Sequence, residues 1–284
     1  MRITVLSVIA FILVWIAAGA GLFYSNGGEP RIVESLRGDE VELFGDGVYA
    51  NNSTFTATIR KGSDLVMLFV SAILLAVTLK RNGQKMKLLH GGLLVSVLYY
   101  AATAAFETVY NQLFLLYLCM FSVAFFVFVF TLIDLHGTIR SASKNGKHTK
   151  TAVFTMVAGC TVLVWLMDVI PGIFTGTPPD FVSIYTTSPT IIIDIGLIFP
   201  TCILGGVMLL RNKPMGYVLP PIMLTFLTVI AVTVVGQTAV QMAYGVNVPP
   251  VHQMVGYVGS FVVFGIIAAV VNVGFMLKCY RNGG

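Results

Sequence analysis

Hydrophobic residues gather along this chain in eight long runs that are separated by short polar stretches. Each run has about 20 residues, the length of an α-helix that crosses roughly 30 Å of hydrocarbon. The pattern therefore predicts an all-α fold, a polytopic membrane bundle of eight transmembrane helices. The predicted spans are residues 3–23, 64–80, 88–107, 112–134, 151–171, 191–210, 216–241 and 254–278.

The first run has a second interpretation as a secretory signal peptide, because Arg2 precedes it and the small residues Ala18-Gly19-Ala20 follow. Cleavage would leave seven spans. We favour a retained helix, since Leu13-Val14-Trp15 recurs as Leu163-Val164-Trp165 and the chain has only these two tryptophans.

A segment of the first half of the chain recurs in the second half, 130 residues later and without a gap. Thirteen positions between residues 64 and 108 are identical to their counterparts, and several of them are polar. The polar identities are Asp64/Asp194, Arg81/Arg211, Asn82/Asn212, Thr103/Thr233 and Thr108/Thr238. A shared preference for apolar residues would not produce these matches, so we interpret them as an internal repeat.

Four spans in each half leave both halves in the same orientation, so the repeat is of the parallel 4+4 type, with a pseudo-two-fold axis along the membrane normal. Transporter-like folds are often built in this way. The predicted units are a first repeat over residues 1–134, a cytoplasmic linker over residues 135–150 and a second repeat over residues 151–284.

Composition and charge support a membrane protein. Hydrophobic residues make up 57% of the chain and charged residues 10%, against about 25% charged residues in a soluble domain. Thirteen of the 17 lysines and arginines fall in loops on the side of the two termini. Cytoplasmic loops retain positive charge, so we expect a cell-membrane protein with both termini in the cytoplasm. The net charge of +5 then reflects loops that face anionic lipid, and no nucleic acid is needed to explain it.

Most polar residues of the spans lie near their outer ends. Asp64 and Asp194 each lie 17 residues before an inner arginine, which is roughly 26 Å along a helix. An acidic residue within an apolar run is by default a functional candidate. We therefore predict an outward-facing pocket on the pseudo-axis that binds a cation or a small polar substrate. Its predicted lining is Asp64, Glu107, Asp168, Asp194, Gln237 and His252.

Local patterns add three expectations. Asp64 follows Lys61-Gly62-Ser63 and has an alternative role as a helix cap or an interfacial residue. Pro200, six residues after Asp194, predicts a kink near residues 196–200. The outer loop, residues 24–63, alternates apolar and polar positions around Gly45-Asp46-Gly47, which predicts short strands that cover the pocket.

Other site types find little support. The sequence has no P-loop, GxSxG, HExxH or CxxC motif, so we expect no cofactor and no metal site. Asp134 and His136 are expected to be solvated, and His90 is expected to find a local hydrogen-bond partner.

Two alternatives to a binding or transport protein stay open. One is a membrane-embedded enzyme that acts on a lipid or lipid-linked substrate through Asp168, Asp194 or Glu107. The other is a non-catalytic assembly or sensor subunit with a protein partner or a second copy of itself.

Two stretches carry a resemblance to known sequences. The first is Tyr110-Asn111-x-Leu113-Phe114-Leu115-Leu116-Tyr117 with Phe121-Ser122, and the second is Asp194-x-Gly196 followed by Pro200 and Leu209-Leu210-Arg211-x-x-Pro214-x-Gly216-Tyr217. In these stretches the chain resembles uncharacterised multi-pass membrane proteins of prokaryotes that are carried as hypothetical proteins. The resemblance implies a bacterial or archaeal cytoplasmic membrane and no particular activity.

Overall fold

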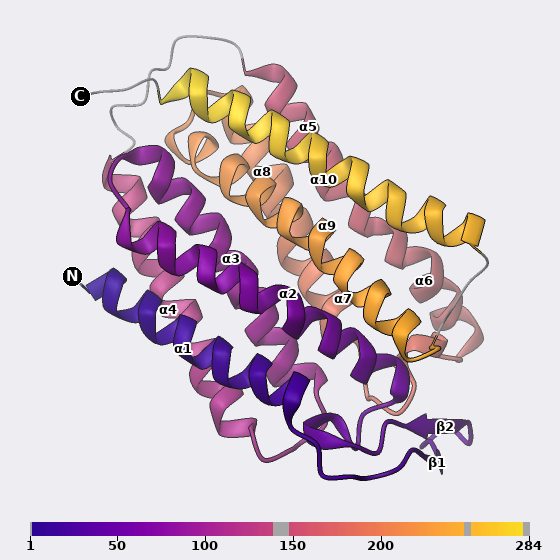
Figure 1. The fold of residues 1–284 in the computed structure, drawn as a ribbon. Coiled ribbons are helices and arrows are strands. Elements are labelled where there is room, and N and C mark those ends of the chain that lie inside the picture. The colour runs from indigo at the N-terminus through magenta and orange to yellow at the C-terminus, as the bar shows by residue number, and fades with distance from the viewer. Residues whose placement is uncertain (1, 139–147, 247–250, 281–284) are drawn as a thin grey trace.

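The computed structural model describes residues 2–138, 148–246 and 251–280. Within this part of the chain, eight helical spans are long and apolar enough to cross a membrane, which confirms the predicted all-α membrane bundle. The axes of the spans are roughly aligned, with neighbouring spans in the chain running in opposite directions, and the start of the first and the end of the last lie at the same end of the bundle (Figure 1). We call this end the basic end, because the turn between the second and third spans there contains Lys80 and Arg81. The opposite end, with the two strands, is the loop end.

Five spans are single α-helices and three are composite. The single helices are α1 (Arg2–Phe23), α2 (Thr54–Leu79), α3 (Gln84–Glu107), α4 (Phe114–Thr138) and α10 (Val251–Cys279). The fifth span consists of α5 (Thr149–Cys160), a 3-10 segment (Thr161–Trp165) and α6 (Leu166–Thr175). The sixth consists of α7 (Pro189–Ile193), a π-helical segment (Asp194–Ile198) and α8 (Phe199–Leu210), and the seventh of a 3-10 turn (Pro214–Tyr217) and α9 (Leu219–Ala243).

Helices α2, α3 and α9 form the centre of the bundle. In their most apolar windows 56%, 78% and 67% of the residues are buried, against 17–28% in the five other spans. Helices α1 and α4 pack on the outside of α2 and α3, while α8 and α10 pack on α9. Lipid supplies the apolar surroundings of the outer helices, so polar side chains are directed toward the central three.

Small residues bring α2 and α9 into close contact. A Cβ atom on Gly62 of α2 would overlap backbone atoms of Gly236 and Gln237 of α9. Small residues at such crossings let backbones approach each other within a membrane. The Gln237 side chain also donates a hydrogen bond from Nε2 to the Ser63 hydroxyl at 2.8 Å, which fixes the crossing.

The predicted start of the second span at residue 64 is wrong. Helix α2 begins at Thr54, where the side chain of the N-cap Ser53 accepts a hydrogen bond from the Thr56 N–H. Asp64 therefore lies in the third turn and does not cap the helix. The threonines that suggested a strand are accommodated in the helix, since the Thr58 hydroxyl donates to the carbonyl of Thr54. Arg60 and Lys61, which we assigned to the outer loop, are buried helical residues.

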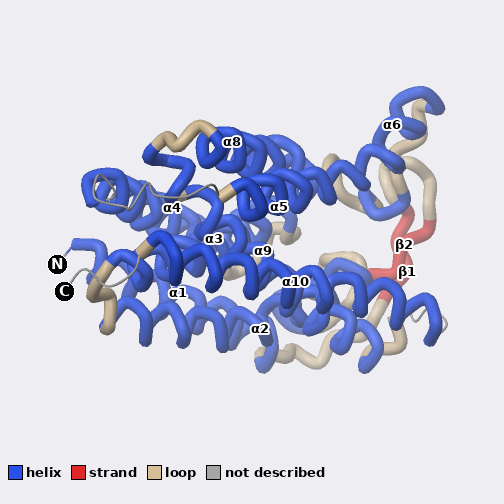
Figure 2. Tube along the Cα trace, turned by 90° about the horizontal axis from the view of Figure 1, so that it is seen from above, coloured by secondary structure: helices blue, strands red, loops and turns tan. Residues whose placement is uncertain are grey.

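The outer loop contains the short strands that its alternation predicts, although only in its first part. Strands β1 (Arg31–Glu34) and β2 (Glu40–Leu43) form an antiparallel hairpin at the loop end (Figure 2). A 3-10 turn, Gly47–Tyr49, follows. Hydrogen bonds from the backbone of Asn26 and the side chain of Ser25 to the Asp46 carboxylate lower the pKa of Asp46. These bonds hold the two ends of the loop together.

The hairpin is joined to the loop between α6 and α7. The Arg37 guanidinium donates to the backbone carbonyls of Ser183 and Tyr185. The Tyr185 hydroxyl accepts a hydrogen bond from the Asn52 side chain at 3.1 Å, and burial raises the pKa of Tyr185 above its usual value. The two long loops of the loop end therefore form one connected cover.

The backbone of the sixth span departs from the α-helix where a kink was predicted. The π-helical segment Asp194–Ile198 ends two residues before Pro200. Proline has no N–H to donate and its ring crowds the carbonyl four residues earlier, which is Gly196. Helix kinks occur at prolines and at π-helical turns, and in this span the two lie together. The fifth span has a further irregularity, its 3-10 segment, that the sequence pattern did not predict.

The linker was predicted over residues 135–150. Its first residues belong to α4, which extends to Thr138, and its last belong to α5, which begins at Thr149. Residues 139–147 lie outside the described part of the chain.

Replacement of Gly62 by leucine tests the α2–α9 crossing. The new side chain would overlap the backbone of α9, so we expect Gly62→Leu to lower the free energy of unfolding by about 1–3 kcal/mol. Gly19→Leu on α1 is the control, because a Cβ at Gly19 meets no atom. Unfolding by titration with sodium dodecyl sulfate, followed by circular dichroism, measures both. Equal stability of the two variants would contradict the close crossing.

Candidate functional site

Three of the predicted acidic residues are arranged around α3 at the loop end. Tyr99 and Tyr100 are consecutive residues of α3 and leave the helix on different sides. The Tyr100 hydroxyl donates to Asp64 Oδ1 at 2.6 Å, and the Tyr99 hydroxyl donates to Asp194 Oδ1 at 3.1 Å. Glu107 is the last residue of the same helix. Helix α3 thus connects the acid of the second span with the acid of the sixth.

Asp64 is fully buried and both of its oxygens have partners. Besides the bond from Tyr100, Asp64 Oδ2 accepts a hydrogen bond from the Tyr49 hydroxyl at 2.8 Å. Burial and the neighbouring Asp64 carboxylate raise the pKa of Tyr49 well above its usual value, so this hydroxyl remains a donor. Hydrogen bonds to a charged group each contribute about 1.5–3 kcal/mol. Asp64 therefore fastens the outer loop, through Tyr49, to the membrane-spanning helices.

Two cations accompany Asp64 on α2. The Arg60 guanidinium lies 4.9 Å from the centre of the Tyr100 ring and donates from Nη1 to the Thr103 hydroxyl at 2.7 Å. The Lys61 ammonium donates to the Gly21 carbonyl at 2.9 Å. Both side chains are buried and lie within electrostatic range of Asp64. A charge in this environment is costly unless other groups compensate it, and here the two cations lower the cost of burying Asp64.

Asp194 and Glu107 have only neutral hydrogen-bond partners among the described residues. Asp194 accepts from the Tyr99 hydroxyl and, at 3.0 Å, from the indole Nε1 of Trp165. Glu107 accepts from the Thr190 hydroxyl at 3.2 Å to each carboxylate oxygen. Both acids are half-buried. Thr190 lies one turn before Asp194 in the sixth span, so α7 brings the two carboxylates to the same edge of α3.

The other predicted lining residues lie outside this group. Gln237 bonds to Ser63 at the α2–α9 crossing. Asp168 is exposed one turn beyond Trp165 and lines a hollow of about 400 Å³ together with Asp180 and Phe181. No hydrogen bond of the described residues joins Asp168 to the three acids around α3. His252 belongs to the first turn of α10, where side chains lie outside the described part of the structure.

Sequence reasoning missed the groups that hold the acids in place. Arg60 and Lys61 were assigned to the outer loop. The four-residue spacing between Arg60 and Asp64 would place these two residues on the same face of a helix. Tyr49, Tyr100 and Trp165 come from distant segments, and nothing in the sequence indicates which acid each would reach. The predicted acidic lining is in fact a group of mixed charge.

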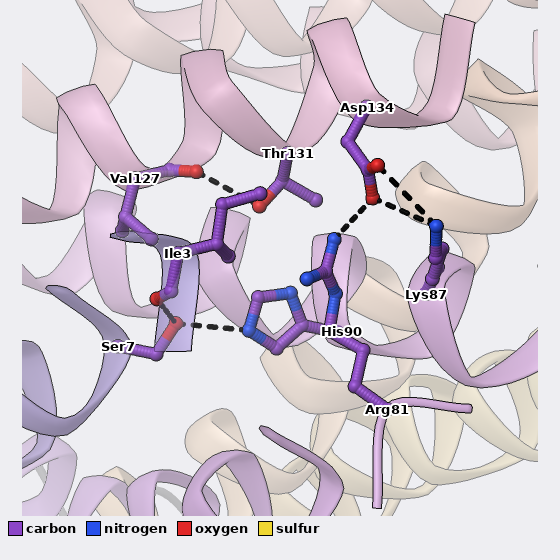
Figure 3. Close-up of polar contacts among 8 residues, drawn as sticks. All are labelled: Ile3, Ser7, Arg81, Lys87, His90, Val127, Thr131 and Asp134. Carbon is purple, nitrogen blue, oxygen red and sulfur yellow. Dashed lines mark hydrogen bonds and ion pairs between the residues drawn. The ribbon is translucent and has the colours of Figure 1, made fainter. Parts of the chain in front are cut away.

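The basic end has a second polar group, which joins helices of the first half (Figure 3). Asp134 of α4 forms ion pairs with Arg81 at 2.5 Å and with Lys87 at 3.0 Å. The expectation that Asp134 is merely solvated is therefore wrong. The two ion pairs connect the end of α2, the start of α3 and the end of α4.

His90 is fully buried beside this group, and its ring nitrogen Nε2 lies 3.0 Å from the Ser7 hydroxyl oxygen. Ser7 donates its own proton to the Ile3 carbonyl, so the His90 Nε2–H is the donor to Ser7. His90 Nδ1 is then an acceptor without a hydrogen-bond partner. The expectation of local satisfaction holds for one ring nitrogen only.

Among the described residues, no group of three or more histidine, cysteine, aspartate or glutamate side chains could hold a metal ion. Comparison of the chain with family models, with curated proteins and with solved structures finds no match. The resemblance to prokaryotic membrane proteins therefore stays a prediction, and the geometry of the loop end carries the functional argument.

Removal of one hydroxyl tests the anchoring of the outer loop. We expect Tyr49→Phe to lower the free energy of unfolding by about 1.5–3 kcal/mol, because one oxygen of a buried carboxylate loses its partner. Tyr110→Phe is the matched control, since Tyr110 is 76% exposed. The same detergent titration measures both variants. A Tyr49→Phe protein as stable as the control would show that the Tyr49–Asp64 bond contributes nothing.

Proposed function

We propose that this integral membrane protein binds a cation or a small polar substrate at the loop end, or carries it across the membrane, with Asp194 and Glu107 as the anionic groups. The observation that carries the proposal is that both carboxylates are half-buried within membrane-spanning helices and have only neutral partners. Acidic residues in such positions are rare and mark ion and substrate pathways.

The backbone beside Asp194 supports this assignment. Asp194 is the first residue of the π-helical segment, and π-helical turns occur frequently at functional sites. Discontinuous helices are also a feature of the binding sites of transporters. Asp64, by contrast, has two hydrogen-bond donors and two nearby cations, so we assign it a positioning role through Tyr100 and Tyr49.

We further infer that the two halves are copies of one four-helix unit. Their helix contacts support this inference, because α1 packs on α2 as α5 packs on α8, and α3 packs on α4 as α9 packs on α10. Helices α3 and α9, which occupy the third position of each half, contact each other. At the offset of 130 residues, Arg60 corresponds to Thr190. Arg60 lies within electrostatic range of Glu107, and Thr190 is hydrogen-bonded to Glu107. Two corresponding residues are expected to approach the same side chain if that side chain lies near a pseudo-two-fold axis.

The proposed orientation places the loop end outside the cell and both termini in the cytoplasm. Alkaline phosphatase inserted after Leu36, and separately after Thr187, should be active, since that enzyme requires export. Green fluorescent protein fused to the C-terminus should fluoresce, because it folds in the cytoplasm. The two phosphatase insertions also test whether the halves have the same orientation. Opposite activities of the two insertions would exclude a parallel repeat.

Neutralisation of Asp194 tests the binding site. The full chain in lipid nanodiscs should be stabilised against heat by at least one of three probes, namely sodium, potassium or methylammonium. In Asp194→Asn and in Glu107→Gln we expect the apparent affinity for that probe to fall by at least about tenfold, or 1.4 kcal/mol, because a buried countercharge is removed. Asp180→Asn is the control, since Asp180 is exposed in a loop.

Equal affinity of the Asp194→Asn and Asp180→Asn proteins would overturn the proposed site. An assembly or sensor subunit would show a different pattern, namely no effect of Asp194→Asn and a strong effect of deleting the hairpin, residues 31–43.

A further inference from the structure

Arg60 has one edge of its guanidinium group without a partner. Its Nη1 donates to Thr103, whereas Nε and Nη2 have no hydrogen-bond partner, although the residue is 2% exposed. Nε–H and Nη2–H lie on the same edge of the planar group, and such an edge binds a carboxylate through two parallel hydrogen bonds. Buried donors without partners are costly. The open edge therefore points to an anionic group that the chain itself does not supply.

Other buried hydroxyls lie at the same end of the bundle. The Tyr117 hydroxyl of α4 is buried, and it lies beside Asn111 and Tyr49 and within electrostatic range of Arg60. The Thr108 hydroxyl, which directly follows Glu107 at the end of α3, is buried and unpartnered. A guanidinium group can only donate, and hydroxyls can donate or accept. A ligand group rich in acceptors would satisfy all of them.

The acids of the chain leave this edge open. Two carboxylates lie within electrostatic range of Arg60, namely Asp64 and Glu107. Both oxygens of Asp64 accept hydrogen bonds from tyrosines. Glu107 lies on the same face of α3 as Thr103, one turn further on, and its two oxygens share the single proton of the Thr190 hydroxyl, 3.2 Å from each. The cationic edge therefore lies within electrostatic range of Glu107 without forming an ion pair with it, and Glu107 in turn lies within electrostatic range of Asp194.

We infer that the substrate of the site is a zwitterion, a small molecule of the amino-acid class with a carboxylate and an ammonium group. Its carboxylate binds Nε and Nη2 of Arg60, and its ammonium group binds between Glu107 and Asp194. The inference rests on the proposed function, since it assigns the ligand of the same site. It explains why anionic and cationic side chains occur together there, which a site for a bare cation would not require.

A surface hollow lies at the same end of the bundle. It has a volume of about 170 Å³ and lies between residues 47–51 and residues 110–112. One of its lining residues, Asn111, lies beside Tyr117. The Asn111 side chain donates to the Val48 carbonyl at 3.0 Å, which joins the two walls.

The experiment uses the full chain in nanodiscs and each standard amino acid separately, at about 10 mM, with heat stability as the measure of binding. Each amino acid that stabilises the protein is compared with its decarboxylated amine and with its deaminated acid. We expect at least one amino acid to bind, and each of its two truncated analogues to bind about tenfold more weakly or worse, because each has lost one charged contact.

Arg60→Lys provides the decisive variant, because it keeps the positive charge and loses the two-pronged edge. We expect its affinity for the amino acid to fall by at least about tenfold, with binding of the amine unchanged. Retained amine binding shows that the variant is folded. Arg31→Lys on the exposed hairpin is the matched control and should bind like the unaltered protein.

Three results would overturn the inference and leave the proposed function in place. The first is an amine that binds as tightly as its amino acid. The second is an Arg60→Lys protein that binds the amino acid normally, or that is only less heat-stable, as expected if Arg60 merely pairs with Glu107. The third is an unaltered chain that binds no amino acid but binds an amine or a cation through Asp194. If the unaltered chain binds none of these probes, the proposed function falls with the inference.

Discussion

The structure depends on one constraint, which is that a charged group within the hydrocarbon layer must find its partners inside the protein. Asp64 shows this most clearly, because it is fully buried and accepts hydrogen bonds from Tyr49 and Tyr100. Three separate parts of the chain, the outer loop, α2 and α3, are thereby held at one carboxylate. The burial of Arg60 and Lys61 next to it follows from the same need, since each cation reduces the cost of burying the acid.

Asp194, at the corresponding position of the second half, has different partners from Asp64. At the offset of 130 residues, Arg60 and Lys61 correspond to Thr190 and Ile191, so Asp194 has no cation at these two positions. Its partners are the indole of Trp165 and the hydroxyl of Tyr99 from the first half. In the repeat that we propose, one acid has cationic neighbours and the corresponding acid has neutral partners only. Such a division suits a protein in which one half holds the structure and the other binds.

Much of the fold could be predicted from the sequence, because eight apolar runs of membrane-spanning length leave little choice. The start of α2 could not be predicted, since Arg60 and Lys61 resemble loop residues until their hydrogen-bond partners are known. The three acids near α3 were predictable as a group from depth alone, given a helix rise per residue. Their hydrogen bonds were not, because Tyr49, Tyr99, Tyr100 and Trp165 reach them through tertiary contacts. The hairpin was predicted only in part, since alternating threonines occur equally well in a helix that bonds their hydroxyls back to its own carbonyls.

The central position of α3 has a consequence for biosynthesis. This helix is enclosed by α2, α4 and α9, and its face toward α9 is lined by Gly91 and Gly92, which contact Ile222 and Thr225. Helix α9 leaves the ribosome more than 100 residues after α3. Until then a groove of small residues and buried polar groups has no protein cover, so the nascent first half depends on the insertion machinery or on transient lipid contacts, and the bundle is completed only when the seventh span arrives.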